Sequence, residues 1–435
     1  MTAEKRRKVS FQTVGCRLNQ YETEKMAADL SRFGFERVLR NEPADLYIIN
    51  TCTVTHKADK DSRYLARKAK RDNPRAKVVL VGCYVETDPE KVLALPEVDV
   101  VIRNSEKEFL CDLLPPRLPD LFSGLSSTEP TGLAEFYQRN RAWIKISDGC
   151  NQTCAYCLVT IVRGNLKCRP ADDIVAEVKS LVGAGYREIV LTAVNMGYYQ
   201  DPEHQPPIRN LAGLCRLLLS ETEIYRLRLS SIEPQTIDDD LIELYRTAGH
   251  RICRHWHIPL QAGSDRILKL MRRPYNREQF AAKLSRLYQA RPGTVIGADV
   301  IVGFPGETEA EFEQAIELVE RAGLNYLHVF SYSDRPGTAA AAMPDKTAPE
   351  EIRHRAKLLT ALSRERLRLA HLDQVGDTLE VISEFKHRID GRHLGISDNY
   401  LRVTLPSDLD SGKKIVKVRI ESATPEHLLG SVIDC

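Results

Sequence analysis

Three cysteines lie close together in the segment SDGCNQTCAYC, residues 147–157. Cys150, Cys154 and Cys157 have the spacing C-x3-C-x2-C. A structural zinc site needs four ligands, and the histidines that follow this segment do not have zinc-finger spacing. Thiolates also hold iron–sulfur clusters, for which the cysteine spacing is diagnostic. If three cysteines hold a four-iron cluster, one iron remains open and can bind a substrate or a cofactor.

A fourth cysteine, Cys168, follows this segment within the chain. It could complete a set of four ligands, but a closed site of that kind would have no open position for chemistry. The alternative is that Cys168 is a small, partly buried residue without a ligand role.

A second group of cysteines is spread over residues 8–112, where strand and helix patterns alternate. The predicted strands are VSFQTVGC, ADLYIINTC, AKVVLVGC and VDVVIR, and this alternation predicts a parallel sheet covered by helices. Cys16, Cys52 and Cys83 each lie at the end of a predicted strand. In an open parallel sheet those ends share one edge, where ligands bind, so the three cysteines should meet in space. The alternative is three buried structural cysteines.

A second strand–helix series runs from residue 141 to about residue 340. Its six predicted strands are AWIKIS, REIVLTA, YRLRLSS, HWHIPLQ, VIGADVIVG and YLHVFSY. Six units predict an incomplete barrel of the (β/α)8 type, whose chemistry lies on loops at the carboxyl ends of the strands. The loop with three cysteines follows the first of these strands. After a helix over residues 349–372, short strands with turn signals predict a small antiparallel barrel.

The predicted fold class is therefore α/β, with four segments. They are an N-terminal domain (1–113), a linker rich in Pro, Ser and Gly (114–140), a partial-barrel domain (141–371) and a C-terminal small barrel (372–435).

Composition limits the classes of function. The chain has 435 residues, of which 43% are hydrophobic and 28% charged, as in globular proteins with a large core. No apolar run reaches the ~18 residues of a membrane span, so we expect no membrane partner. The start of the chain has no apolar stretch typical of a signal peptide, so we expect a cytoplasmic protein. Eleven cysteines in that compartment favour metal binding or catalysis over disulfides.

The net charge is only +2, so a nucleic-acid partner would need a local basic patch. Residues 57–71 predict a helix, and the i, i+4, i+7, i+8 spacing puts four of its five cations on one face: Lys60, Arg63, Arg67, Lys70 and Arg71. This face would suit the phosphates of an RNA. The alternative is an ordinary solvated surface.

The cysteine loop also carries a family resemblance. C-x3-C-x2-C with Tyr156 before the last cysteine, after the first strand of such a barrel, resembles the radical S-adenosylmethionine (SAM) superfamily. Further segments resemble the methylthiotransferases of that superfamily over nearly the whole chain. They are TVGCRLNQYETE, NTCTVTHKAD, VLVGCY, EIVLTAVNMGYY, RLSSIEP, HIPLQAGSDRILKLMRRPY, DVIVGFPGETEAEF and HVFSYSDRPGTAA.

The resemblance implies a flavodoxin-like N-terminal domain, a (β/α)6 radical-SAM barrel and a terminal barrel like the TRAM domain, which binds RNA. It implies two 4Fe-4S clusters. Cys150, Cys154 and Cys157 would hold the first, whose open iron binds SAM, and Cys16, Cys52 and Cys83 would hold the second. Tyr156 is a candidate for SAM binding. Four polar residues at strand ends facing the expected cofactor are further candidates: Asn195, Ser231, Glu233 and Gln261. Each of these four could instead be a cap or a supporting group.

Three branches of the family differ in substrate. GCRLNQYETE, NTCTVTHKAD and LTAVNMGYY resemble the branch that modifies N6-threonylcarbamoyladenosine next to the anticodon of tRNA. This resemblance implies a transferase that inserts sulfur into a C–H bond, methylates it, contacts the anticodon stem-loop and takes electrons from an external donor. The alternatives are isopentenyladenosine in tRNA or an aspartate of a ribosomal protein as the substrate. A non-enzymatic RNA-binding protein with structural zinc is the alternative from another class. Ala193 and Ala262 depart from residues that are frequent in relatives, but neither departure removes a cysteine.

Overall fold

The structure is a computed structural model that describes residues 7–39, 41–125, 127, 140–389, 391–407, 409 and 412–434. The chain forms two compact units. The first comprises residues 1–138, 149–151 and 157–165, and the second comprises residues 139–148, 152–156 and 166–435. Within the described ranges, no helix combines the length and the apolar character needed to cross a membrane.

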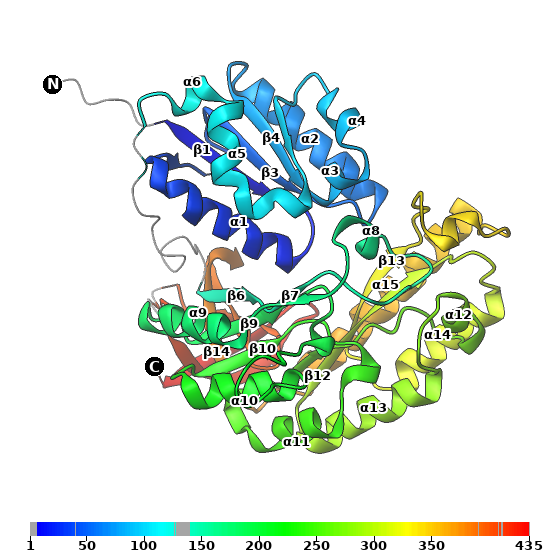
Figure 1. Cartoon of the computed structure of the whole chain (residues 1–435). Coiled ribbons are helices and arrows are strands. Elements are labelled where there is room, and N and C mark those ends of the chain that lie inside the picture. The colour runs from blue at the N-terminus through cyan, green and yellow to red at the C-terminus, as the bar shows by residue number, and fades with distance from the viewer. Residues whose placement is uncertain are drawn as a thin grey trace. The chain divides into compact units, whose positions relative to one another are not determined.

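The first unit contains a five-stranded parallel sheet (Figure 1). Its strands are β1 (Lys8–Thr13), β2 (Glu36–Arg37), β3 (Leu46–Thr51), β4 (Lys77–Gly82) and β5 (Val100–Ile102). The order β2-β1-β3-β4-β5 is that of a flavodoxin-like sheet. The structure therefore confirms the predicted parallel sheet and its flavodoxin-like topology.

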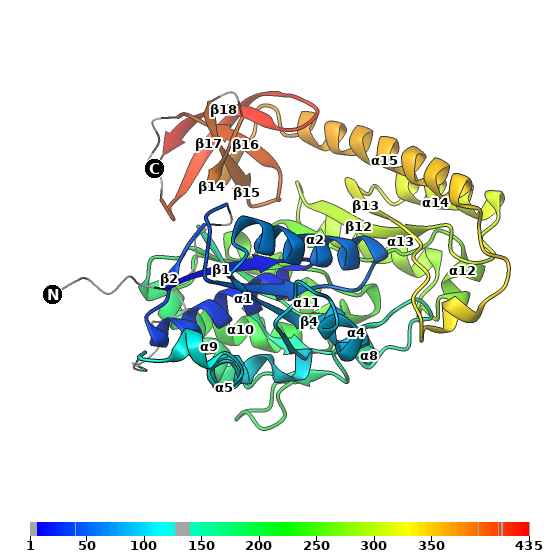
Figure 2. The ribbon, with the colours of Figure 1, turned by 90° about the horizontal axis from the view of Figure 1, so that it is seen from above.

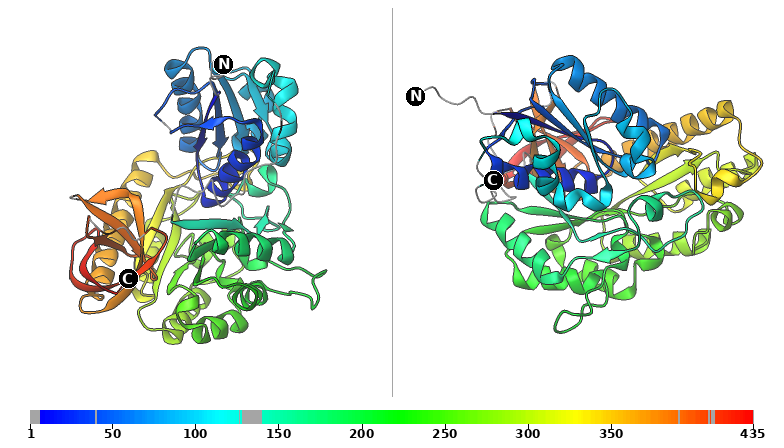
Figure 3. Two further views of the ribbon diagram at one scale, coloured as in Figure 1. Left: turned by 90° about the vertical axis from the view of Figure 1, so that its left-hand side faces the viewer. Right: turned by 45° about the horizontal axis from the view of Figure 1, so that its top comes forward.

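Helices cover both faces of this sheet, as the left panel of Figure 3 shows. They are α1 (Arg17–Leu30), α2 (His56–Asp72), α3 (Cys83–Thr87), α4 (Pro89–Leu93), α5 (Leu110–Arg117) and α6 (Pro119–Phe122). Side chains alternate between the faces of β3: Ile49 packs with Leu65 of α2, whereas Ile48 packs with Met26 of α1 and Leu114 of α5. Every residue of β3 is buried, as expected for a strand between two helical layers.

The end of this unit lies further along the chain than the predicted boundary at residue 113. Helices α5 and α6 continue to Phe122, and Leu114, Leu118 and Phe122 belong to the core with α1. The Pro and Gly residues that predict a linker therefore begin inside helical structure. Most of the rest of the predicted linker lies outside the described residues.

The second unit contains six parallel strands, as predicted. They are β6 (Arg141–Lys145), β9 (Glu188–Thr192), β10 (Arg226–Leu229), β11 (His255–His257), β12 (Val295–Val302) and β13 (Tyr326–Ser331). They form two three-stranded sheets, β10-β9-β6 and β11-β12-β13, linked by the bridges Leu227–Ile252 and Ser231–His257. This arrangement confirms the partial barrel. The helices that accompany it are α9 (Ala171–Gly183), α10 (Leu211–Glu221), α11 (Asp239–Thr247), α12 (Asp265–Leu270), α13 (Arg277–Ala290), α14 (Glu309–Arg321) and α15 (Pro349–Leu372).

Helix α15 leads into a closed five-stranded barrel (Figure 2). Its strands are β14 (Thr378–Ile389), β15 (Arg392–Ser397), β16 (Arg402–Leu405), β17 (Ile415–Ala423) and β18 (Leu428–Asp434). The prediction of an antiparallel barrel was wrong for one pair, because β16 and β18 are parallel. An odd number of strands cannot close into a ring with every pair antiparallel, so one parallel pair is required.

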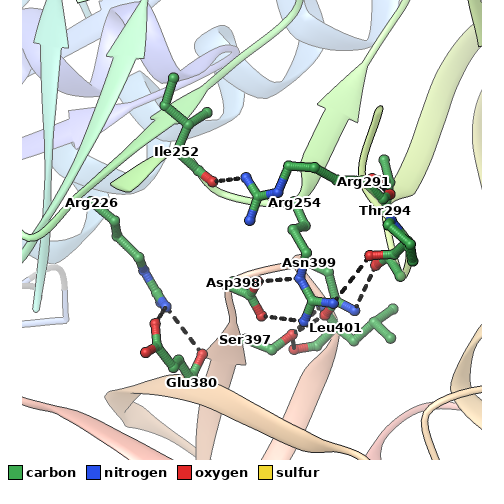
Figure 4. A network of polar contacts seen from close by, with 12 residues as sticks. Arg226, Ile252, Arg254, Arg291, Thr294, Glu380, Ser397, Asp398, Asn399 and Leu401 are labelled. Atoms are coloured by element: carbon green, nitrogen blue, oxygen red, sulfur yellow. Dashed lines mark hydrogen bonds and ion pairs between the residues drawn. The ribbon is translucent and has the colours of Figure 1, made fainter. Parts of the chain in front are cut away.

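A buried group of charges joins this small barrel to the six-stranded part of the same unit. Glu188 is fully buried and accepts hydrogen bonds of 2.7 Å from the Nε atoms of both Arg226 and Arg228, and Arg141 lies 3.5 Å away. Burial opposes ionisation of Glu188, but the three arginines outweigh it, so the pKa of this carboxyl lies well below its usual value. Figure 4 shows the neighbouring contacts, in which Arg226 reaches Glu380 and Arg254 reaches Asp398 of the barrel. The network fixes the barrel at the amino-terminal ends of β9 and β10.

Candidate metal centres

The first candidate centre lies where the connections of the N-terminal sheet diverge. The chain leaves β1 and β3 toward opposite faces of the sheet, and such a point forms a crevice at the carboxyl ends of the strands. Cys16 caps the start of α1 after β1, Cys52 follows β3 directly, and Cys83 is the first residue of α3 after β4. The structure thus places all three predicted cysteines at one edge of the sheet.

Glycine at position 15 allows the first two of these cysteine loops to approach closely. Gly15 has φ of +100°, a conformation that L side chains rarely adopt. A Cβ atom there would lie 2.6 Å from Cβ and 2.9 Å from Sγ of Cys52. A side chain at position 15 would therefore collide with Cys52.

The charge state of the first group favours metal binding over free thiolates. Burial raises the pKa of Cys52 to about 12, and Cys16 and Cys83 raise it further because their charges would repel. Desolvation of its thiol raises the pKa of Cys16 too, although the residue as a whole is exposed. Without a metal the thiols of Cys16 and Cys52 hold their protons, and a bound metal would displace them. Three thiols at one edge of the sheet are a donor set that fits an iron–sulfur cluster with one open iron.

One arginine supplies positive charge next to these cysteines. Arg163, just after α8 (Val159–Val162), has a side chain only 3% exposed. Its guanidinium donates to Glu22 (2.9 and 3.2 Å) and to Asn19 (2.6 Å), both on α1. It lowers the pKa of Cys16 against the larger effect of burial. Nζ of Lys107 also donates to the Glu22 carboxylate, at 2.5 Å, so this carboxylate contacts two cations.

Arg163 provides a test of this centre. Replacing Arg163 with Met removes one of the cations that contact the Glu22 carboxylate, and with it the positive charge beside Cys16. We expect iron bound by the first cysteine group to be held about 10- to 100-fold more weakly, as for other residues that support metal ligands. Iron analysis after timed chelation would measure this loss. Arg75→Gln, at an exposed position, is the control, and equal iron retention in both variants would contradict the assignment.

The second candidate centre is the loop that contains Cys150, Cys154 and Cys157. Gly149 has φ of +68°, and a Cβ there would lie 2.1 Å from the carbonyl oxygen of Asn165. The amide of Cys150 donates to the carbonyl of Gly164 at 3.1 Å. The amide of Val159 donates to Sγ of Cys157 at 3.4 Å. Backbone groups therefore help to fix the course of the loop around Cys150 and Cys157.

The part of the loop around Cys154 is held by a buried arginine. Nη1 of Arg273 donates to Sγ of Cys154 at 3.1 Å, and its Nη2 contacts the carboxylate of Glu233. Nε of Arg273 donates to the hydroxyl of Tyr275 at 3.1 Å. Burial opposes the charge of Arg273, but Tyr275, Tyr156 and Cys154 outweigh it and raise its pKa. Arg273 therefore places a cation directly against the Cys154 sulfur.

Sequence reasoning missed Arg273 and Tyr275, although both lie in the segment LMRRPY that carried the family resemblance. The signal available in the sequence was the pair of adjacent arginines in that segment. The structure adds that Arg273 is only 7% exposed, and a buried arginine is rare unless it is paired.

The structure places the predicted SAM-binding residues at strand ends. Arg273 links Glu233 to Cys154, because its guanidinium contacts both side chains. Asn195 is buried after β9, Ser231 pairs with His257 after β10, and Gln261 follows β11. Gln261 has φ of +65°, which is unfavourable for a residue with a side chain. Its backbone N–H donates to the carbonyl of Asp299 at 2.8 Å. The roles of these residues toward SAM stay predictions.

The remaining cysteines that the structure describes have structural surroundings. Cys168 lies in strand β8 (Lys167–Cys168), which pairs with β7 (Ser147–Asp148), and its sulfur contacts the carbonyl of Tyr198 at 4.0 Å. Cys111, Cys215 and Cys253 are buried. Trp143 and Trp256 are buried in strands.

Known proteins resemble this chain in sequence and in fold. Residues 8–103 match the uncharacterized protein family UPF0004, and residues 144–319 match the radical SAM superfamily, which implies SAM and a 4Fe-4S cluster. The threonylcarbamoyladenosine tRNA methylthiotransferase MtaB of Bacillus subtilis (strain 168) is 38% identical over 95% of this chain and 94% of its own. The tRNA-2-methylthio-N(6)-dimethylallyladenosine synthase of Cereibacter sphaeroides (strain ATCC 17023) is 33% identical over 98% of both chains.

A solved structure, the radical SAM methyltransferase TsrM from Kitasatospora setae with cobalamin and a [4Fe-4S] cluster bound, has a TM-score of 0.55. It is 16% identical and covers 77% of each chain, so this likeness concerns the fold alone. The two sequence relatives match over most of the length of both chains. This chain belongs to the methylthiotransferase family of the radical SAM superfamily.

Proposed function

We propose that this methylthiotransferase acts on tRNA and converts N6-threonylcarbamoyladenosine, next to the anticodon, to its 2-methylthio derivative. The observation that carries the proposal is the presence of two separate groups of three cysteines, each at the carboxyl ends of parallel strands. Each group has three thiols, which suits a 4Fe-4S cluster with one open iron.

Two such centres fit the reaction. Sulfur insertion into an unactivated aromatic C–H bond needs a strong hydrogen-abstracting radical and a separate source of sulfur. With a cluster bound, the group Cys150, Cys154 and Cys157 supplies the one-electron reduction of SAM on which radical chemistry depends. The group Cys16, Cys52 and Cys83 would hold the second cluster, as a place for the sulfur. An external donor would supply the electrons.

This chain's own residues prepare the SAM site. Arg273 holds Glu233 and places a positive charge on the Cys154 sulfur, in surroundings from which burial excludes water. Tyr156, Asn195, Ser231, Glu233 and Gln261 are the side chains we propose for SAM. Their strand-end positions in a partial barrel support this role.

The basic helix supports tRNA as a partner. Lys60, Tyr64, Arg67 and Arg71 of α2 are exposed, and Tyr64 is 54% exposed. Cations with an interleaved aromatic side chain suit phosphates and an unstacked base. Arg63 contributes less than its sequence position suggests, because it donates to the hydroxyl of Tyr84 at 2.8 Å. We propose that this face of α2 contacts the anticodon stem-loop.

The choice of modified adenosine rests on the relatives. The MtaB protein named above is 38% identical to this chain, and the dimethylallyladenosine synthase is 33% identical. The first therefore supports threonylcarbamoyladenosine, and isopentenyladenosine is the second candidate. An RNA-binding protein without catalysis does not fit membership of this enzyme family.

Mass spectrometry of tRNA nucleosides from cells that lack this chain tests the substrate. We expect the 2-methylthio form of threonylcarbamoyladenosine to disappear and unmodified threonylcarbamoyladenosine to accumulate. Re-expression of the chain should restore the product, and Cys215→Ala, a change in the core of α10, should restore it equally. Loss of the isopentenyl product instead would reassign the substrate, and unchanged tRNA would refute tRNA as the target.

A further inference from the structure

A cluster of imidazole, carboxylate and phenol groups lies on three neighbouring strands of the second unit, beside the backbone of Ser231 and Gln261. His257 ends β11, Asp299 lies in β12, and His328 lies in β13. Asp299 and His328 are direct partners across the parallel strands. Tyr326, two residues before His328, lies on the same face because side chains alternate along a strand.

The three side chains direct their ligand atoms at one point. Nε2 of His257 lies 2.9 Å, and Nδ1 of His328 lies 3.3 Å, from the same oxygen, Oδ1 of Asp299. All three ligand atoms lie within 4.8 Å of one another. Two imidazoles and one carboxylate from separate strands are a donor set that binds zinc or iron(II).

A further hydrogen bond orients the most buried ligand. The hydroxyl of Tyr326 lies 3.3 Å from Nδ1 of His257 and 2.8 Å from Nε2 of His255. Ligating histidines commonly use their second ring nitrogen in this way, which fixes the tautomer and the ring orientation. Gly297 makes room for this tyrosine, since a Cβ there would lie 2.0 Å from the Tyr326 ring.

Access also suits a cation. The side chains of His257, Asp299 and His328 are 9%, 23% and 54% exposed. The cluster thus opens on the side of His328, on the edge strand of its sheet.

We propose that His257, Asp299 and His328 form a binding site for one divalent cation of the zinc or iron(II) class. Three protein ligands leave the remaining coordination positions open on the His328 side, where water or an oxygen donor of a substrate can bind. Tyr326 is a positioning residue that acts through His257. The site does not depend on which substrate the enzyme modifies.

Zinc binding by the full chain with its iron loaded tests the site. After incubation with zinc and desalting, we expect wild-type protein to retain one zinc that Asp299→Asn and His328→Ala bind about 10-fold or more weakly. Zinc K-edge X-ray absorption should show nitrogen and oxygen neighbours at about 2.0–2.1 Å and no sulfur at about 2.3 Å, because zinc in a cysteine site would show sulfur.

His250→Ala provides the matched control, since His250 is an exposed histidine outside the cluster, and it should retain zinc as the wild type does. Iron content reports folding, and His328 is exposed enough that its loss should not disturb packing. Zinc bound only through sulfur, or zinc retained fully by folded His328→Ala, would overturn the proposal.

Discussion

Cys150→Ala should abolish reductive cleavage of SAM. Cys150 belongs to a group of three cysteines, so one substitution leaves two possible thiolate ligands, too few to hold a cluster stably. We expect 5′-deoxyadenosine formation to fall about 1000-fold or more, to the background of the assay, because SAM no longer has an electron donor bound to it. Iron should fall from about eight to about four per chain if both cysteine groups hold four-iron clusters.

Two matched variants make this result specific. Cys215→Ala removes a thiol that is fully buried in α10 and should leave iron content and deoxyadenosine formation unchanged. Cys168→Ala tests the alternative of a closed site with four cysteines, and we expect it to keep the iron because the sulfur contacts the carbonyl of Tyr198. Deoxyadenosine formation by Cys150→Ala at the wild-type rate would refute the assignment of the radical centre.

Glu188→Gln should destabilise the second unit strongly. Glu188 is the shared partner of Arg141, Arg226 and Arg228, and a neutral amide would leave these buried guanidinium groups without a compensating charge there. Breaking a buried ion pair of this kind costs about 3–5 kcal/mol, which should lower the thermal unfolding midpoint by roughly 5–15 °C. Differential scanning calorimetry of the iron-loaded chain would measure this shift.

The control for Glu188 is an ion pair at the surface. Glu243 pairs with Arg246 at 2.6 Å on α11, and both side chains are more than half exposed. Because water and salt screen such a pair, Glu243→Gln should leave the unfolding midpoint unchanged. Equal midpoints for Glu188→Gln and wild type would show that the arginines rearrange and that the buried network does not fix the small barrel.

The sequence predicted most of the fold because its signals are local. Alternating strand and helix patterns identified the parallel strands of both units, and the Gly and Asn turns between short strands identified the terminal barrel. The errors arose where local signals conflict with packing. The prolines at 115 and 116 predict a linker, yet they lie in α5, whose Leu114 is held in the core by α1. The parallel pairing of β16 with β18 follows from barrel closure, which no local pattern contains.

The candidate centres, too, were predictable from the sequence only in part. Strand-end position and spacing identified six cysteines, because parallel strands bring their carboxyl ends to one edge whatever the length of the connections. The charges that support these cysteines were not predictable. Arg163 and Glu22 are 141 residues apart in the chain, and Arg273 and Cys154 are 119 residues apart.

The amino-acid sequence by itself determined the order of strands and helices and the places where thiols gather, since both follow from short-range periodicity and spacing. The tertiary structure alone decided which charged groups are buried and what they face: Arg163 beside Cys16, Arg273 on Cys154, Glu188 among its arginines and His328 across from Asp299. The physical reason is that the desolvation of a charge and its partner depend on segments that meet only when the elements pack. A lysine or an arginine on a solvated face has the same local sequence pattern as one inside a site.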